Sequence, residues 1–258
     1  MSTETADLLT ATLAREIASS GVRMFAVTSP AAIAAGRAAR ELGAPELALI
    51  VGFSVIDGSP VPSVSLGEAG LLTAGPTFRD EPDDVFVGLA RGRVGVAATP
   101  AQLDASGRTN LSGIGEPGNP KVALPGARGL PDHRSTSRVW YLFASHGPRQ
   151  LVETVDVVCG AVPPPGALRR LITPAGCFEL AAGGWKALWL TTGGAELVAS
   201  APGLGVVLSG EEPVIDAPDE EALAALQLAD PHGVRHIEFA EGPEATRLWR
   251  AAAEREAV

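Results

Sequence analysis

Large aromatic side chains, cysteine and lysine are all scarce in this 258-residue chain. Aromatic residues make up 5%, with a single tyrosine, while hydrophobic residues make up 46%. The core must therefore be built mainly from Ala, Val and Leu, as is common in layered α/β proteins. Only Cys159 and Cys177 are present, without CxxC spacing, which excludes a disulfide framework and a cysteine-based metal or redox motif. Both lie in apolar runs and are expected to be buried thiols.

Positive charge is also in short supply. The net charge is −10 and the isoelectric point about 4.9. Such a field repels phosphate backbones and anionic lipids, so we expect neither a nucleic-acid partner nor a membrane. A local basic pocket for one anionic ligand, such as coenzyme A, remains compatible with this average.

No apolar run is long enough to span a bilayer. The first seven residues are polar and acidic, unlike a signal peptide, so we expect a cytoplasmic protein.

Hydrophobic periodicity indicates an alternation of helices and strands. The opening reads as helix 8–19, strand 22–27, helix 31–42 and strand 47–51, with Ser29 and Pro30 as N-cap and first-turn proline. This rhythm is typical of a parallel sheet covered by helices. Further helices are expected at 81–91, 220–227 and 244–256, and further strands at 94–98, 138–144, 151–158, 170–180 and 186–192. We predict one α/β domain over residues 1–258, with an open, mainly parallel sheet flanked by helices.

A polar, Gly- and Pro-rich stretch covers residues 99–137, broken only by 122–124. A structureless stretch of this length inside a compact domain is usually functional, so the site is sought here first. Within it, GIGEPG at 113–118 matches the GxGxxG dinucleotide pattern. Pro117 and Pro120 leave no helix for that pattern to open, and a plain loop is expected instead of a nicotinamide site.

Four ordered segments carry a family resemblance. The segment ATPAQLDASGRTNLS at 98–112 places Gln102, Asp104, Gly107 and Asn110 in a Q-[VL]-D-x-x-G-x-x-N turn. The other three are KVALPGARG at 121–129, LVETVDVVCG at 151–160 and LITPAGCFEL at 171–180. Together they resemble the β subunits of glutaconate-type class I CoA-transferases, and also those of the cholesterol ring-opening acyl-CoA hydrolases.

The resemblance implies a site for an acyl-CoA thioester. A typical family member uses a glutamate to attack the acyl-CoA carbonyl, while backbone amides of a glycine-rich loop stabilise the oxyanion. By this resemblance the oxyanion loop is formed by Gly126, Ala127, Arg128 and Gly129, and an ordinary Pro-Gly turn is the alternative. Substrate-binding positions are expected at Gly52, Phe53, Gln102, Asn110 and Arg134. Coenzyme A enters only as part of the substrate, and no permanently bound cofactor or metal is expected.

The chain departs from the family at the nucleophile. The glutamate should follow the second strand, in 49-LIVGFSVIDG-58, but alignment places Gly52 or Phe53 there and the next acid is Asp57. The ring-opening hydrolases also lack a β-subunit glutamate. We therefore expect a β-type subunit that acts with an α-type subunit in a heterodimer or α2β2 assembly, with hydrolytic chemistry on a C–C or thioester bond. A conventional CoA-transferase and a non-catalytic scaffold subunit remain alternatives.

Two polar residues follow the glycine loop. Arg134 has the fork geometry to bind a carboxylate or a CoA phosphate, and His133 is a candidate general base. A solvated polar loop is the alternative for both. His146, His232 and His236 lack metal-ligand spacing and are expected at the surface or at helix caps.

Overall fold

The computed structural model describes residues 1–27, 29–51, 55–56, 78–79, 82–136 and 138–256. The chain groups into two compact units, one formed by Met1–Val85 with Asp216–Val258 and the other by Phe86–Ile215. Each is described separately, and a single domain over 1–258 stays a prediction.

The first unit opens with the predicted alternation of helices and strands. Its opening elements are α1 (Thr3–Ser19), β1 (Met24–Val27), α2 (Pro30–Glu41) and β2 (Ala48–Val51). Ser29 caps α2 by accepting the Ala32 N–H, with Pro30 in the first turn, as predicted. β1 and β2 pair in parallel. Gly36 stands where a Cβ would lie 2.6 Å from Leu49 Cδ2, which explains a glycine inside a helix that covers this sheet.

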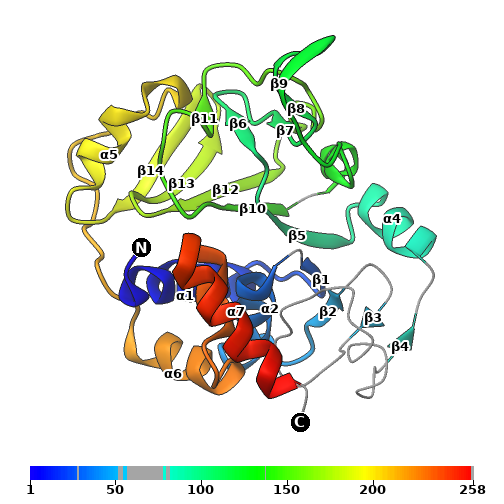
Figure 1. Cartoon of the computed structure of the whole chain (residues 1–258), viewed down its shortest axis with the longest axis vertical. Helices are drawn as coiled ribbons and strands as arrows, with labels where there is room; N and C mark the ends of the chain where they lie inside the picture. The colour runs from blue at the N-terminus through cyan, green and yellow to red at the C-terminus, as the bar shows by residue number, and fades with distance from the viewer. Residues whose placement is uncertain (28, 52–54, 57–77, 80–81, 137, 257–258) are drawn as a thin grey trace. The chain divides into compact units, whose positions relative to one another are not determined.

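Two short strands extend this sheet and further helices complete the unit. Antiparallel β3 and β4 give the strand order β1-β2-β3-β4. The remaining elements are β3 (Val55–Ile56), β4 (Phe78–Arg79), α6 (Glu220–Ala229), η3 (Val234–Phe239) and α7 (Gly242–Glu256). In Figure 1 the C-terminal elements, in orange and red, lie beside the N-terminal helices in blue. Leu9, Leu13 and Ile17 form a fully buried stripe of α1.

The second unit holds a five-stranded mixed sheet with the order β14-β13-β12-β10-β5. Its strands are β5 (Val94–Ala98), β10 (Arg138–Leu142), β12 (Leu168–Thr173), β13 (Gly176–Ala181) and β14 (Gly184–Leu190). β10 pairs in parallel with both β5 and β12, whereas β13 and β14 join antiparallel. The predicted α/β class, with an open, mainly parallel sheet flanked by helices, is confirmed. Within this unit the parallel strands are β12, β10 and β5.

The polar stretch 99–137 is more ordered than predicted. It contains β6 (Gln102–Asp104), β7 (Thr109–Asn110), β8 (Gly113–Glu116), β9 (Asn119–Ala123) and the 3-10 helix η1 (Leu130–Arg134). β8 and β9 form a hairpin of their own, which projects beyond β6 and β7 in Figure 1. These strands escaped prediction because they are short and polar, so they show no apolar alternation. GIGEPG belongs to this hairpin and opens no helix.

Two predicted strands have different bounds. The run 151–158 keeps only β11 (Leu151–Val152), because Asp104 Oδ2 accepts the Val155 N–H at 3.3 Å and draws the chain into a turn. The run 170–180 is a hairpin of β12 and β13 that turns at Pro174 and Ala175, and Gly176, whose φ is +147°, begins the second strand. The sequence prediction misses two short elements, α5 (Gly194–Ser200) and η2 (Pro202–Leu204). A further helix, α4 (Pro82–Ala90), matches the predicted helix 81–91.

The few large aromatic residues concentrate in the core of the second unit. Trp140, Tyr141, Phe143, Phe178 and Trp185 are all at most 1% exposed. Both cysteines are buried and free, as predicted. Among the described helices, none combines the length and apolarity needed to cross a bilayer.

Candidate functional site

The segment 125–129 connects β9 to η1 in an unusual backbone conformation. Gly126 has φ +102° and Arg128 has φ +50°, the left-handed value that a non-glycine residue rarely adopts. Gly129, by contrast, has φ −81°. Neighbouring residues of opposite handedness point successive N–H groups toward one side, which is a common arrangement for holding an anion.

Three amides of this segment are available to a ligand. Within the described part of the chain, the N–H groups of Ala127, Arg128 and Gly129 donate to no acceptor. The Gly126 N–H, which the sequence placed in the same oxyanion loop, instead donates to the Leu111 carbonyl at 3.0 Å. The segment therefore offers three free donors, and Gly126 is the anchor that ties them to the neighbouring chain.

The anchor residue is held from both sides. The Leu111 N–H donates to Cys159 Sγ at 3.3 Å while its carbonyl accepts Gly126. Next to it, the Leu124 N–H donates to the Ser112 carbonyl at 3.0 Å, and Ser112 Oγ lies 3.0 Å from the same sulfur. The β8–β9 hairpin thus starts and ends on a short backbone strap, residues 111–112, that packs against Cys159.

A buried polar network lies under this strap. Asn110 Nδ2 donates to Gln102 Oε1 at 2.7 Å, and Gln102 Nε2 donates to Asp156 Oδ2 at 3.2 Å. Asp156 Oδ2 also accepts the Gly115 N–H at 2.8 Å. Gln102 and Asn110 are 4% and 0% exposed. These contacts join β6, β7, the hairpin and the 151–160 segment, and substrate contact by Gln102 or Asn110 stays a prediction.

The aspartate of the same motif closes a tight turn. Asp104 Oδ1 accepts the N–H groups of Ser106 and Arg108, and its Oδ2 accepts Arg108 Nε at 2.7 Å. Gly107, with φ +81°, lies where a Cβ would come within 2.5 Å of Leu180 Cδ2. The Q-L-D-x-x-G motif therefore has a structural basis, which is a turn that only glycine can complete at this position.

His133 lies in η1, directly after the loop, and is 7% exposed. Burial lowers the pKa of His133 to about 4, with a smaller contribution from the charge of Arg169. The imidazole is therefore neutral at pH 7, and its Nδ1 has no hydrogen-bond partner among the described residues. A neutral ring is the form that a general base requires, but a pKa this low makes it a weak one. Its catalytic role stays a prediction.

Arg169 is a buried residue that the sequence did not single out. It is 1% exposed, and its Nη2 donates to the carbonyls of His133 at 2.6 Å and Thr136 at 3.1 Å. It also shares a hydrogen bond with Tyr141, whose pKa burial raises to about 12. Arg169 thus holds the end of η1. The adjacent Arg170 obscured it, because strand alternation alone does not say which of two arginines points inward.

The remaining predicted site residues are spread over the surface or fall outside the described residues. Arg128 and Arg134 are exposed, which leaves their guanidinium groups accessible to an anion. Gly52 and Phe53 lie outside the described residues. Unlike the surface or helix-cap position predicted for it, His146 is buried, 5% exposed, and hydrogen-bonds Thr173 Oγ1 through Nδ1 at 2.9 Å. The Phe178 ring lies beside it, with the two ring centroids 5.4 Å apart.

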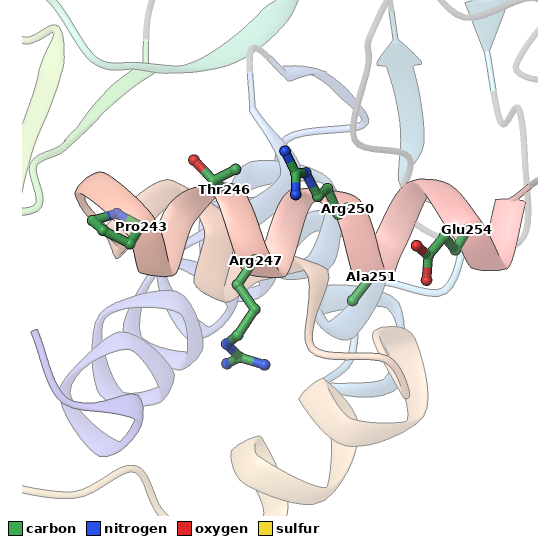
Figure 2. A pocket seen from close by; sticks show the side chains of 6 residues that line it. All are labelled: Pro243, Thr246, Arg247, Arg250, Ala251 and Glu254. Carbon is green, nitrogen blue, oxygen red and sulfur yellow. The ribbon is translucent and has the colours of Figure 1, made fainter.

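No group of three or more His, Cys, Asp or Glu side chains suited to a metal ion occurs within the described ranges. A surface hollow runs along α7 in the first unit. Figure 2 shows its lining side chains, with Thr246 and Arg250 on one side of the helix and Arg247 and Ala251 on another. All of its lining residues come from one helix, and Arg247 is already paired with Glu244. Because a single helix lines this hollow, no side chains from other elements converge on it, and it is not a candidate site.

Comparison with solved structures places the chain among known folds. The decarboxylase AibA/AibB matches with a TM-score of 0.80 and 28% identity, over 93% of this chain and 100% of that one. IpdAB of Rhodococcus jostii RHA1 matches with a TM-score of 0.74 and 24% identity, over 92% and 98%. Glutaconate coenzyme A-transferase of Acidaminococcus fermentans matches at 0.70 and 17%, over 90% and 98%. No family model and no curated protein matches the sequence.

Proposed function

Because this chain belongs by its fold to the class I CoA-transferase family, we propose that it is the β-type subunit of a heteromeric enzyme that cleaves a C–C bond in an acyl-CoA. The observation that carries the proposal is the 125–129 segment, with three successive amides free to hold a developing oxyanion. The similar decarboxylase is named as a pair of components, AibA and AibB, which supports an α-type partner for this chain as well.

Cleavage of a C–C bond suits a site without a nucleophilic glutamate. When a carboxylate stands β to the thioester carbonyl, or on the γ carbon of an α,β-unsaturated thioester such as glutaconyl-CoA, the bond to that carboxylate breaks and CO2 leaves. The electron pair moves to the thioester oxygen, giving an enolate, and a proton then adds to the carbon. This route forms no covalent enzyme intermediate. It needs donors at the oxygen, which the amides of Ala127, Arg128 and Gly129 supply, and a proton donor, which we assign to the partner subunit.

Decarboxylation is the reaction we favour, and hydrolysis is the second candidate. The decarboxylase at 28% identity supports the first. The motifs shared with the ring-opening hydrolases support the second, in which water adds to a carbonyl whose oxyanion the same amides hold. The segment 49–58 contains no glutamate, which argues against CoA transfer through a glutamyl thioester.

The test uses the chain co-purified with its α-type partner and glutaconyl-CoA as the probe. Mass spectrometry separates the reactions, since decarboxylation releases CO2, hydrolysis of the thioester releases free CoA thiol and glutaconate, and transfer requires an added acceptor such as acetate. We expect CO2 release without an acceptor. A trapped glutamyl-CoA adduct on this chain would establish a transferase instead. Equal turnover with and without substitutions in the 125–129 segment would favour a scaffold subunit.

A further inference from the structure

We infer that Asn110 is a positioning residue that sets the direction of the three free amides through Leu111 and Gly126. The inference rests on the proposed role of the 125–129 segment. It assigns Asn110 an indirect role in the reaction, in place of contact with the substrate.

Asn110 fixes the backbone that follows it. Its Oδ1 accepts the N–H groups of Ser112 at 2.9 Å and Gly113 at 3.4 Å, and its Nδ2 donates to the Gly113 carbonyl at 2.7 Å. The second Nδ2 hydrogen bond goes to Gln102 Oε1, which holds the side chain against β6. One side chain therefore closes the turn 110–113 and connects it to the neighbouring strand.

Leu111 lies inside that turn, so its carbonyl direction follows from these contacts. Its N–H donates to Cys159 Sγ. The Cys159 thiol in turn donates to Asn110 Oδ1 over 3.7 Å. The Leu111 carbonyl then receives the Gly126 N–H. The next three amides follow Gly126 directly along the chain, so a rotation of the backbone at this anchor redirects them. An oxyanion donor is effective only within a narrow range of distance and angle.

Direct contact between Asn110 and a substrate conflicts with its surroundings. The residue is 0% exposed, and both atoms of its amide are engaged in the hydrogen bonds described above. An amide has two donors and one acceptor oxygen, and here both donors are in use. The side chain can influence chemistry only through the backbone that it holds.

Amide hydrogen exchange, measured by NMR on the unliganded chain, tests the positioning role without any substrate. In wild type we expect the Gly126 amide to be protected and those of Ala127, Arg128 and Gly129 to exchange quickly. In Asn110→Ala, loss of the anchor should make Gly126 exchange about tenfold faster or more. Core amides of β10 such as Tyr141 should keep their protection. Asn110→Asp retains the acceptor for Ser112 and should keep much of the Gly126 protection.

The exposed Asn119 on β9 provides a matched control. Asn119→Ala should leave the exchange protection of both the Gly126 amide and the Tyr141 amide as in wild type. If Asn110→Ala does not fold, Cys159→Ala tests the same anchor from the other side of Leu111. The positioning role is wrong if Gly126 stays protected when Asn110→Ala folds, or if every amide of the second unit loses protection together.

Turnover then separates this inference from the proposed function. In the complex with the α-type chain, Asn110→Ala should lower kcat by about tenfold or more, with little change in KM, because the donors serve mainly the transition state. Asn110→Asp should restore part of the loss. If wild type turns over no acyl-CoA, the proposed function fails while the exchange result still decides the anchor. Loss of Gly126 protection with unchanged kcat would overturn the link to catalysis.

Discussion

Arg169 on β12 donates a 2.6 Å hydrogen bond to the carbonyl of His133 on η1, although 36 residues separate them in sequence. A buried guanidinium thus binds backbone carbonyls at the end of a 3-10 helix, where partial negative charge accumulates. Its positive charge also reaches the His133 ring and disfavours a second proton there. This contact joins the parallel sheet to the segment that follows the candidate oxyanion loop.

Replacing Arg169 should raise the pKa of His133. In Arg169→Met the repelling charge is gone, but burial, the larger cause of the shift, remains. We therefore expect the His133 pKa to rise above about 4 and to stay below 6.5, as measured by NMR titration of the ring. Arg170→Met is the matched control, because Arg170 pairs with Glu179 and should leave His133 unchanged. An unaltered titration in Arg169→Met would show that the charge has no effect on His133.

Acid should destabilise the fold through its buried histidines. The pKa of His146 is lowered by burial from 6.5 to about 4, so the unfolded chain binds more protons between these values. Its contribution to stability is complete above pH 6.5 and is lost as the pH falls toward 4. Between pH 7 and about pH 4.5, wild type should lose on the order of 2 kcal/mol more than His146→Asn. Urea unfolding at both pH values measures this difference, and parallel losses in the two proteins would contradict it.

Substitution of Gly126 should impair turnover more than folding. A Cβ there meets nothing within 4 Å, so the site has room for a side chain to begin, but φ +102° is unfavourable for valine. Relief of that strain should rotate the anchor and misdirect the free amides, and the loss of one oxyanion donor costs about 10²–10³ in kcat. Gly118→Val, also in open space but without a positive φ, is the control. Wild-type turnover in Gly126→Val would make the segment an ordinary turn.

A buried ion cluster should dominate the stability of the first unit. Arg235 Nη1 donates to Asp230 Oδ2 at 2.9 Å, and its Nε donates to Asp7 Oδ1 at 2.8 Å. The Asp230 carboxylate is fully buried, so Arg235→Met leaves it without its cation and should cost about 3–5 kcal/mol. The exposed pair of Arg247 and Glu244 is the comparison, and Arg247→Ala should change stability far less, because both charges stay in contact with water. Equal effects in urea unfolding would remove the distinction.

Assembly with an α-type chain should complete the site. The 125–129 segment presents free amides near its surface, and Val122, Val158 and Val162 of the same unit are about half exposed. We expect an α2β2 complex when the two chains are expressed together. Size-exclusion chromatography with light scattering measures this. A monodisperse single-chain monomer with full activity would contradict it.

The sequence alone was sufficient for the elements whose signals are local. The opening alternation of α1, β1, α2 and β2 was predicted because apolar stripes, a serine N-cap and a first-turn proline act within a few residues. Four ordered motifs were sufficient for the family, since a turn such as Asp104–Gly107 needs specific residues at fixed spacing. The glycine-rich segment at 125–129 was singled out for the same reason, and its role as an oxyanion loop stays a prediction.

Only the tertiary structure decided how that segment is held. Leu111, Asn110 and Cys159 meet beneath it through contacts between residues up to 49 positions apart, which leave no periodic trace in the sequence. The division of its amides into one anchor and three free donors also depends on a long-range hydrogen bond. Only the structure showed that His146 and Arg169 are both buried. The environment of a polar side chain is set by strands that pack against it from elsewhere in the chain, which the local sequence does not reveal.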